Sequence, residues 1–402
     1  MLKLARLICL LGFLGVCTTG TSLAAETVDN QAMIKEIVEE VFDAKRPIHV
    51  GGALRVNYGY QDWDNRHDET YGDFAFDLFR LDVNGAMDDW ILSAQYRFYP
   101  EYDFHTLRHG YVGYNVSDNW QVQVGVHQVP FGLQPYASHN FWFSGAYYVG
   151  LEDDYDMGVK GLYSNGPLDL TLAFYKNAEL GSSGNAKRYS IDVISNADGG
   201  YAGAQADGNE ETNQFNGRLA YTLDHRDLGT TEFGVSAEWG ELYNGITSDS
   251  GDHWATGLHM NGNYGNWNVQ LEAATYGYNP ENPVGFSDNI ITMGAFGYSW
   301  GVPAEADIGI ANVAYTRPMK LKWLDSITVY SDTTIIKPSA SNQPTIWQNV
   351  VGAMFASGPV YTYVDIISGE NMIFSGGNMV DESDDNNDER TTRINLNIGY
   401  YW

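Results

Sequence analysis

Cysteine is nearly absent from this 402-residue chain, because Cys9 and Cys17 are its only two cysteines and both lie among residues 1–25. These residues place Lys3 and Arg6 before a short apolar run and a small-residue stretch, which is the layout of a secretory signal peptide. A transmembrane anchor is the alternative, but the apolar run is too short to span a bilayer. Removal of the peptide would leave an exported chain that no disulfide framework holds together.

Basic residues and long apolar runs are scarce as well. The chain has 22 lysines and arginines against 51 aspartates and glutamates, which gives a formal net charge of −29 and argues against nucleic acid as a partner. Beyond the first 25 residues, no stretch approaches the roughly 20 apolar residues that a membrane helix needs. Glycine and aromatic residues are abundant instead, with 44 glycines, 28 tyrosines and 11 tryptophans. An exported chain of this composition can reside in a membrane if it closes a β-barrel.

One segment has helical periodicity. Within residues 28–44, apolar side chains such as Ile34, Val38 and Val41 recur on one helical face. We therefore expect residues 26–46 to form a short N-terminal periplasmic helical segment. A coiled coil, a plug and a linker packed against a barrel all remain open as its role.

From residue 47 onward, the apolar residues alternate with polar ones, as in β-strands. A β-sandwich also alternates, but its connections should be short at both ends. Here tight turns alternate with long connections, as in outer-membrane barrels, which have short periplasmic turns and longer outer loops. The long connections lie near 61–72, 128–155, 178–212 and 243–252.

The number of strands follows from this asymmetry. A simple tally of alternating segments gives seventeen, whereas a barrel whose chain starts and ends in the periplasm needs an even number. Treating residues 279–306 as one folded outer loop restores an even count. We therefore predict an all-β fold, a 16-stranded antiparallel transmembrane β-barrel over residues 47–402, which is wide enough for an aqueous channel. Tyr400 and Trp402 of the last strand are expected at the membrane boundary, where aromatic rings are favoured.

The stretch GVHQVPFGLQP, residues 125–135, ends a predicted strand with Pro130, Phe131 and Gly132. Together with the SGP turn at Ser357 and the aromatic C-terminus, it resembles the phosphate-selective porin O and P family of Gram-negative outer-membrane channels.

The resemblance extends over most of residues 47–402 and implies a homotrimer. It also implies that residues 130–148, which include His139 and Trp142, fold into the barrel as a constriction loop. This segment contains no lysine or arginine, so phosphate selectivity is not carried over. Its aromatic residues can either stack on sugars or pack the loop against the barrel wall.

Arginines on the polar faces of neighbouring strands are candidate pore-lining residues. Arg55, Arg80 and Arg97 should reach a similar height near the middle of the barrel, with Arg393 somewhat higher. Arg80 needs a bulge near Leu78 and Phe79 to point inward. An arginine on the lipid side would cost a few kcal/mol at mid-membrane, which favours the lumen. The strip either attracts anions or is neutralised by acidic neighbours such as Asp82.

Acidic residues fall on the polar faces of strands across the barrel. The candidates are Glu238, Glu272, Asp332 and Asp365. Opposed strips of charge would orient water and dipolar solutes at the narrowing. Arg218 is a further expected lumen charge, and because the identified positive and negative charges nearly balance, ion preference is left open.

Two outer segments are strongly acidic, at residues 151–156 and 381–389. Their carboxylates could bind Ca²⁺ and bridge to lipopolysaccharide, although neither segment has EF-hand spacing. A solvated loop that concentrates cations is the alternative. We expect no other cofactor.

The sequence thus predicts a porin of a Gram-negative outer membrane, surrounded by lipid and lipopolysaccharide, that passes small hydrophilic solutes or ions. Anion preference through the arginines is one form of this hypothesis. An outer-membrane hydrolase is an alternative, but the histidines are scattered and no serine has a recognisable nucleophile context, so no catalytic residue is assigned. A binding scaffold that uses acidic outer loops is a second alternative.

Overall fold

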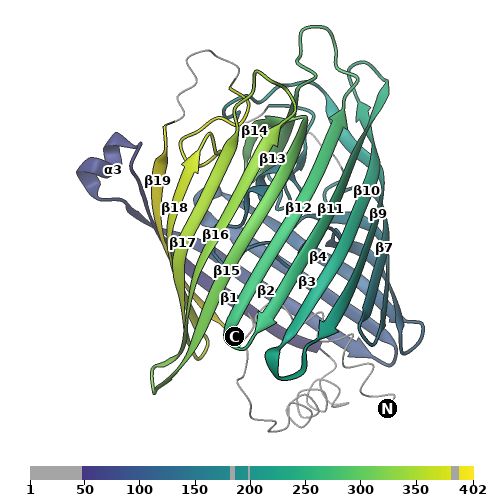
Figure 1. The fold of residues 1–402 in the computed structure, drawn as a ribbon. Coiled ribbons are helices and arrows are strands. Elements are labelled where there is room, and N and C mark those ends of the chain that lie inside the picture. Colours follow the sequence, from purple (N-terminus) through teal and green to yellow (C-terminus); the bar gives the residue numbers. More distant parts are fainter. Residues whose placement is uncertain (1–47, 182–185, 198–199, 382–388) are drawn as a thin grey trace.

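The computed structural model describes residues 48–181, 186–197, 200–381 and 389–402. The predicted signal peptide and N-terminal helical segment lie outside these residues. Sixteen strands close into one antiparallel barrel (Figure 1), which confirms the predicted fold class. Among the described residues, no helix has both the length and the apolar character needed to cross a membrane.

The barrel strands follow one another around the wall in chain order. They are β1 (Ile48–Gln61), β2 (Asp73–Met87), β3 (Trp90–Tyr99), β4 (Phe104–Asn115), β5 (Trp120–Gln128), β6 (Tyr155–Asn165), β7 (Leu168–Ala178), β9 (Asn209–Asp224), β10 (Thr230–Asn244), β11 (Ser250–Tyr264), β12 (Trp267–Asn279), β15 (Glu305–Leu321), β16 (Leu324–Pro338), β17 (Ile346–Ser357), β18 (Val360–Glu370) and β19 (Thr391–Tyr401). The barrel closes where β1 pairs with β19, with Ala53 opposite Tyr401 and Gln61 opposite Arg393. Every barrel strand therefore has two neighbours, so no edge is left unpaired in the membrane.

The outward face of the barrel is apolar, and aromatic residues mark the rim that carries the tight turns. Exposed apolar side chains occur on nearly every strand, and Tyr400 and Trp402 remain 50% and 51% exposed. Tryptophan–tyrosine pairs stand beside three of the tight turns, with ring centroids 4.8 to 5.0 Å apart. These pairs are Trp90–Tyr114, Trp120–Tyr163 and Trp267–Tyr315. Such an aromatic girdle is typical of a barrel surrounded by lipid.

Long outer loops carry the remaining elements. The loops contain α3 (Asn65–Thr70), η1 (Pro100–Tyr102), η2 (Gly145–Val149), β8 (Asp192–Val193), β13 (Ile290–Ala295) and β14 (Tyr298–Pro303), and a turn at the opposite end contains η3 (Arg226–Leu228). The helix α3 projects sideways from the wall beside β19 (Figure 1). Strand β13 pairs with β14 and with β8 in a separate three-stranded sheet. The outer loop predicted at 279–306 is therefore correct, and this is why the barrel has sixteen strands.

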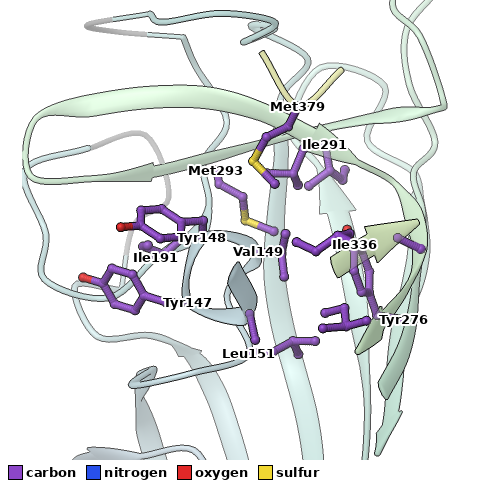
Figure 2. Close-up of a cluster of buried hydrophobic side chains, with 14 of the residues drawn as sticks. Tyr147, Tyr148, Val149, Leu151, Ile191, Tyr276, Ile291, Met293, Ile336 and Met379 are labelled. Atoms are coloured by element: carbon purple, nitrogen blue, oxygen red, sulfur yellow. The ribbon is translucent and has the colours of Figure 1, made fainter. Parts of the chain in front are cut away.

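A hydrophobic core lies between the loops and one side of the inner wall. Figure 2 shows Tyr147, Tyr148, Val149 and Leu151 packed with residues of three other loops and with wall residues. The partners labelled there are Ile191, Ile291, Met293 and Met379 from the loops and Tyr276 and Ile336 from β12 and β16. This side of the lumen is apolar because β15 also turns Ile308 and Ile310 inward. The core fixes the loops on the β10 to β16 side of the barrel.

Candidate functional site

The loop between β5 and β6, residues 129–154, enters the barrel and is called the inner loop below. It includes the segment 130–148 that the sequence analysis assigned to the constriction. Its two ends meet at a neck, where the main-chain N–H of Val129 donates to the carbonyl of Asp154 at 2.9 Å. The inner loop has little regular structure beyond η2, so most of its N–H groups need acceptors from elsewhere.

The Pro130-Phe131-Gly132 turn is fixed to β10, β11 and β12. The N–H of Gly132 donates to Ser236 Oγ at 3.0 Å, and the N–H of Leu133 donates to Glu272 Oε2 at 2.7 Å. Gly132 has a φ of +53°, and a Cβ there would lie 2.4 Å from Glu272 Oε1. Glycine is therefore required both for the left-handed backbone and for the close approach of the carboxylate.

Arg218 and the ring of Phe131 make further contacts between this turn and the barrel wall. Arg218 donates from Nε to the carbonyl of Gly132 at 2.8 Å and from Nη2 to Glu232 Oε1 at 2.6 Å. The ring of Phe131, which is 4% exposed, lies over Gly257 of β11, where a Cβ would be 3.1 Å from the ring. Arg218 thus holds the inner loop and forms an ion pair, rather than standing free in the lumen.

The tip of the inner loop is bound by two aspartates of β16 and β18. Asp332 accepts from the N–H of His139 at 2.7 Å and from the N–H and side-chain amide of Asn140 at 3.1 and 2.8 Å. Asp365 accepts from the N–H of Phe141 at 3.3 Å and from the hydroxyl of Tyr330 at 2.5 Å. The second ring nitrogen of His139, Nε2, lies 2.6 Å from Asn268 Oδ1.

These contacts revise the expected role of the acidic strip. Glu272, Asp332 and Asp365 do point inward, but their oxygens are occupied by N–H groups of the inner loop. Glu238 is also buried and accepts from the amide of Asn216 at 3.0 Å. The acidic side of the lumen therefore binds the inner loop and is not an open charged surface.

A buried glutamate organises the inside of the inner loop. Glu152 accepts from the N–H groups of Ala137 and Ser144, each at 3.0 Å, and from the hydroxyls of Ser138 and Ser144. Burial raises the pKa of Glu152 to about 7, although the hydrogen bonds from Ser144 oppose the shift. The loop's shape thus depends on one carboxyl group that titrates near neutral pH.

The opposite side of the lumen carries the arginines. Arg80 of β2 stands directly across from Arg97 of β3, and Ala53, two residues before Arg55, stands across from Arg80. A bulge allows this arrangement. In the pairing of β1 with β2, no residue of β1 stands opposite Asp77, so the bulge lies one residue before the position expected at Leu78 and Phe79. The three arginines therefore lie at one height, with Arg393 beyond them on β19.

Carboxylates neutralise some of these arginines and not others. Arg55 pairs with Asp77 at 2.7 Å and Arg80 with Asp82 at 2.8 Å. Arg97 instead donates to Gln95 Oε1 at 2.6 Å and to the hydroxyl of Tyr99 at 2.9 Å. In the part of the chain that the structure describes, no carboxylate is within ion-pair distance of Arg97.

Aromatic residues of the inner loop face this strip. Phe141 lies 4.9 Å from the guanidinium of Arg55, and Trp142 lies 4.3 Å from that of Arg393. Arg393 also donates to the carbonyl of Phe374 at 3.0 Å, and none of the described carboxylates pairs with it. Other loop aromatics, such as Tyr147, are buried in the hydrophobic core. Phe141 and Trp142 thus contact the arginines of the opposite wall directly, while the rest attach the loop to the wall.

Sequence reasoning missed one arginine of this region. Arg108 of β4 is 2% exposed, pairs with Asp153 of the inner loop and donates to the hydroxyl of Tyr136 at 2.9 Å. A β-bulge places it inward, because Gln95 of β3 faces His109 and the next pair skips Arg108. The signal available in the sequence was the cost of a mid-strand arginine on a lipid face.

Comparison with known proteins supports the fold. No protein-family model and no curated protein sequence matches the chain. Among solved structures, the outer membrane channel DcaP of Acinetobacter baumannii is similar at 12% identity and a TM-score of 0.56, over 88% of this chain and 97% of that one. The anion-selective porin from Comamonas acidovorans is similar at 11% identity and a TM-score of 0.54, over 88% and 99%. OmpT of Vibrio cholerae is similar at 10% identity and a TM-score of 0.53, over 88% and 97%.

These likenesses concern the fold. The chain has the barrel of Gram-negative outer-membrane porins, and its apolar outer face places it in such a membrane. Membership of the porin O and P family stays a prediction.

Proposed function

We propose that this protein is a passive outer-membrane channel for small hydrophilic solutes that favours anions. The observation that supports it is the asymmetry of the lumen. The inner loop covers the carboxylates of Glu272, Asp332 and Asp365, while the arginines stand on the other side of the lumen. These carboxylates already accept hydrogen bonds from the loop, whereas Arg97 and Arg393 have no carboxylate partner among the described residues. The charge of the two arginines should therefore contribute more to the field in the lumen.

Solutes would pass beside the arginines and the aromatic edge of the inner loop. The side chains of Arg55 and Asp77 keep 14% and 15% of their surface exposed, so solvent reaches this pair. Arg97 is 6% exposed and lies under the ring of Tyr189, and Arg393 contacts Trp142, so these arginines would attract anions through their electric field rather than by direct contact.

Planar-bilayer recordings test the proposal. The purified protein should give discrete conductance steps, and its reversal potential in a potassium chloride gradient should have the sign of chloride preference. Absence of conductance from correctly folded protein would refute the channel. Conductance with potassium preference would refute only the anion selectivity.

A homotrimer is part of the same proposal, supported by the resemblance of the Pro130-Phe131-Gly132 loop to a family of trimeric porins. Native mass spectrometry of the detergent-purified protein should give three chains per particle. A monomer with full conductance would remove the trimer and leave the channel.

A contact between Ser93 and His109 bears on the hydrolase alternative. Ser93 Oγ lies 3.0 Å from His109 Nε2, as in a nucleophile and base pair. The same hydroxyl donates to Asn84 Oδ1 at 2.7 Å, so its proton is directed away from the histidine. This arrangement suits a structural hydrogen bond better than nucleophile activation. Hydrolysis of phospholipid or peptide that is lost in Ser93→Ala would reverse this judgement.

The binding-scaffold alternative relied on the acidic segment 381–389, most of which lies outside the described residues. Deletion of this segment should leave conductance intact if the protein is a channel.

A further inference from the structure

Three aspartates meet near the outer end of β6, where the inner loop rejoins the barrel. One carboxylate oxygen from each of Asp154, Asp156 and Asp192 lies within 4.8 Å of the other two. Asp154 ends the inner loop, Asp156 belongs to β6, and Asp192 belongs to β8 in the loop that follows β7. The acidic cluster, as these three residues are called below, thus joins three separate segments.

The surroundings of the acidic cluster add more negative charge. Glu179, Glu211 and Glu238 are close enough to interact electrostatically with its members. The cation that the structure pairs with this group is Arg188, whose Nη1 lies 3.0 Å from Asp192 and 3.7 Å from Glu179. One guanidinium does not balance six carboxyl groups.

Several of these oxygens are buried without a hydrogen-bond partner. Asp156 and Asp192 are 2% and 1% exposed. The Oδ1 atoms of Asp154, Asp156 and Asp192 have no hydrogen-bond partner among the described residues. Buried ionised carboxylates are strongly unfavourable unless they are paired or coordinate a metal. Elsewhere in the inner loop the carboxylates are satisfied, as Glu152 and Asp153 illustrate.

We propose that the acidic cluster binds a divalent cation, and that calcium is the ion that fits it. Calcium takes oxygen ligands at 2.3–2.6 Å, so two oxygens on one ion lie at most about 5 Å apart, and the three oxygens of the cluster all lie within 4.8 Å of one another. Magnesium needs near-ideal octahedral geometry at 2.0–2.1 Å and gives up its waters reluctantly, so a buried site built from protein carboxylates suits it less well. Zinc prefers nitrogen and sulfur ligands, and the cluster offers oxygen alone.

The position of the ion gives it a mechanical role. Asp154 forms the neck of the inner loop through its carbonyl, and Asp192 sits in the strand that pairs with β13 at Gly294. A shared ion would tie the neck to the barrel wall and to the three-stranded loop sheet. Calcium would therefore hold the inner loop in place, whether or not the barrel is an anion channel.

Protons are the competing way to neutralise the cluster. Burial and the charges of Asp156 and Asp192 raise the pKa of Asp154 well above its usual range. Calcium and protons would compete, so calcium affinity should fall as the pH is lowered.

The experiment compares two triple variants of the full-length folded protein in detergent. Asp154→Asn/Asp156→Asn/Asp192→Asn removes the cluster. Asp118→Asn/Asp227→Asn/Asp288→Asn removes the same charge from exposed positions and serves as the control. Each protein is stripped with EDTA and titrated with calcium chloride, by isothermal calorimetry and by the midpoint of thermal unfolding.

The wild type and the control should bind one calcium per chain at this site and unfold at a higher temperature in its presence. The cluster variant should lose this binding event and the calcium-dependent shift, and in EDTA it should be at least as stable as the wild type because the repulsion is gone. If the cluster variant fails to fold, Asp154→Asn alone should weaken calcium binding at least tenfold. Calcium binding that is equal in all variants, or a wild type without any calcium response, would overturn the proposal.

Discussion

Asp332 and His139 are joined twice: the N–H of His139 donates to Oδ2 at 2.7 Å, and its ring nitrogen Nδ1 lies 2.7 Å from Oδ1. Burial lowers the pKa of His139, but the hydrogen bond and charge of Asp332 outweigh it and raise that pKa overall. A charged histidine at this position strengthens the attachment. One carboxylate of β16 therefore fixes the tip of the inner loop.

Loss of this carboxylate should mobilise the inner loop. Asp332→Ala removes an acceptor from the N–H groups of His139 and Asn140 and leaves them buried. A lost charged hydrogen bond costs about 2 kcal/mol, so the detached state should become roughly 30-fold more populated. Single-channel recordings should show more frequent current fluctuations than in the wild type.

Asp307→Ala is the matched control for this change, because Asp307 lies on the neighbouring strand β15 and is exposed on the outer face. It should leave the fluctuations unchanged. Quiet recordings from Asp332→Ala would mean that the aspartate is not what holds the tip.

Gly132→Ala should detach the other end of the inner loop. A left-handed φ of +53° costs alanine about 1 kcal/mol, and its Cβ would collide with Glu272 Oε1. Displacement of Glu272 removes the acceptor of the Leu133 N–H, which adds about 1–3 kcal/mol. The expected result is a lower thermal-unfolding midpoint together with noisier currents.

Gly166 provides the comparison for this glycine. It has a φ of +60° in the tight turn between β6 and β7, and a Cβ there meets nothing within 4 Å. Gly166→Ala should therefore show the backbone cost alone. Equal effects of the two substitutions would contradict the collision with Glu272.

Strand alternation in the sequence predicted which side chains face inward, because each barrel strand places one face in lipid and the other in the lumen. On β3 the inward residues Ser93, Gln95 and Arg97 follow this rule without a break. On β4 the bulge at Arg108 breaks it, and local sequence does not reveal a bulge. The same limit applies to Arg80, whose inward position required a bulge that the sequence could only place approximately.

The sequence did not predict that the carboxylates of the acidic strip bind the inner loop, and the reason is different. Glu272 and Asp332 are inward-facing as expected, but their partners are 139 and 193 residues away in the chain. Which N–H groups need acceptors depends on the path of the inner loop. That path is set by packing against the inward residues of β15 and β16, rather than by the loop's own composition.

Ion preference should depend on the unpaired arginines. Arg97→Gln removes a positive charge that no described carboxylate neutralises, so the reversal potential should move toward cation preference by several millivolts in a tenfold salt gradient. Arg80→Gln/Asp82→Asn removes an ion pair of zero net charge and should not move it. Gln95 bridges Asp82 to Arg97, so the double variant also shows whether the pair acts through that bridge. A shift in the double variant as large as that of Arg97→Gln would contradict this assignment.

The attachment of the inner loop should weaken as the pH rises through neutrality. The pKa of Glu152, about 7, lies above its usual value of 4.5, so between these values the folded loop holds a proton that an opened loop releases. The bound proton stabilises the folded loop fully below about pH 4.5, and this contribution is lost as the pH approaches and passes 7. Its size is of order 1–3 kcal/mol.

Wild-type channels should therefore fluctuate more at pH 8 than at pH 5. Glu152→Gln keeps the group neutral at both values, so its fluctuations should depend less on pH. Other buried carboxyl groups titrate in the same range, so the quantity to measure is the difference between the pH profiles of the wild type and Glu152→Gln. Identical profiles would exclude Glu152 as the titrating group.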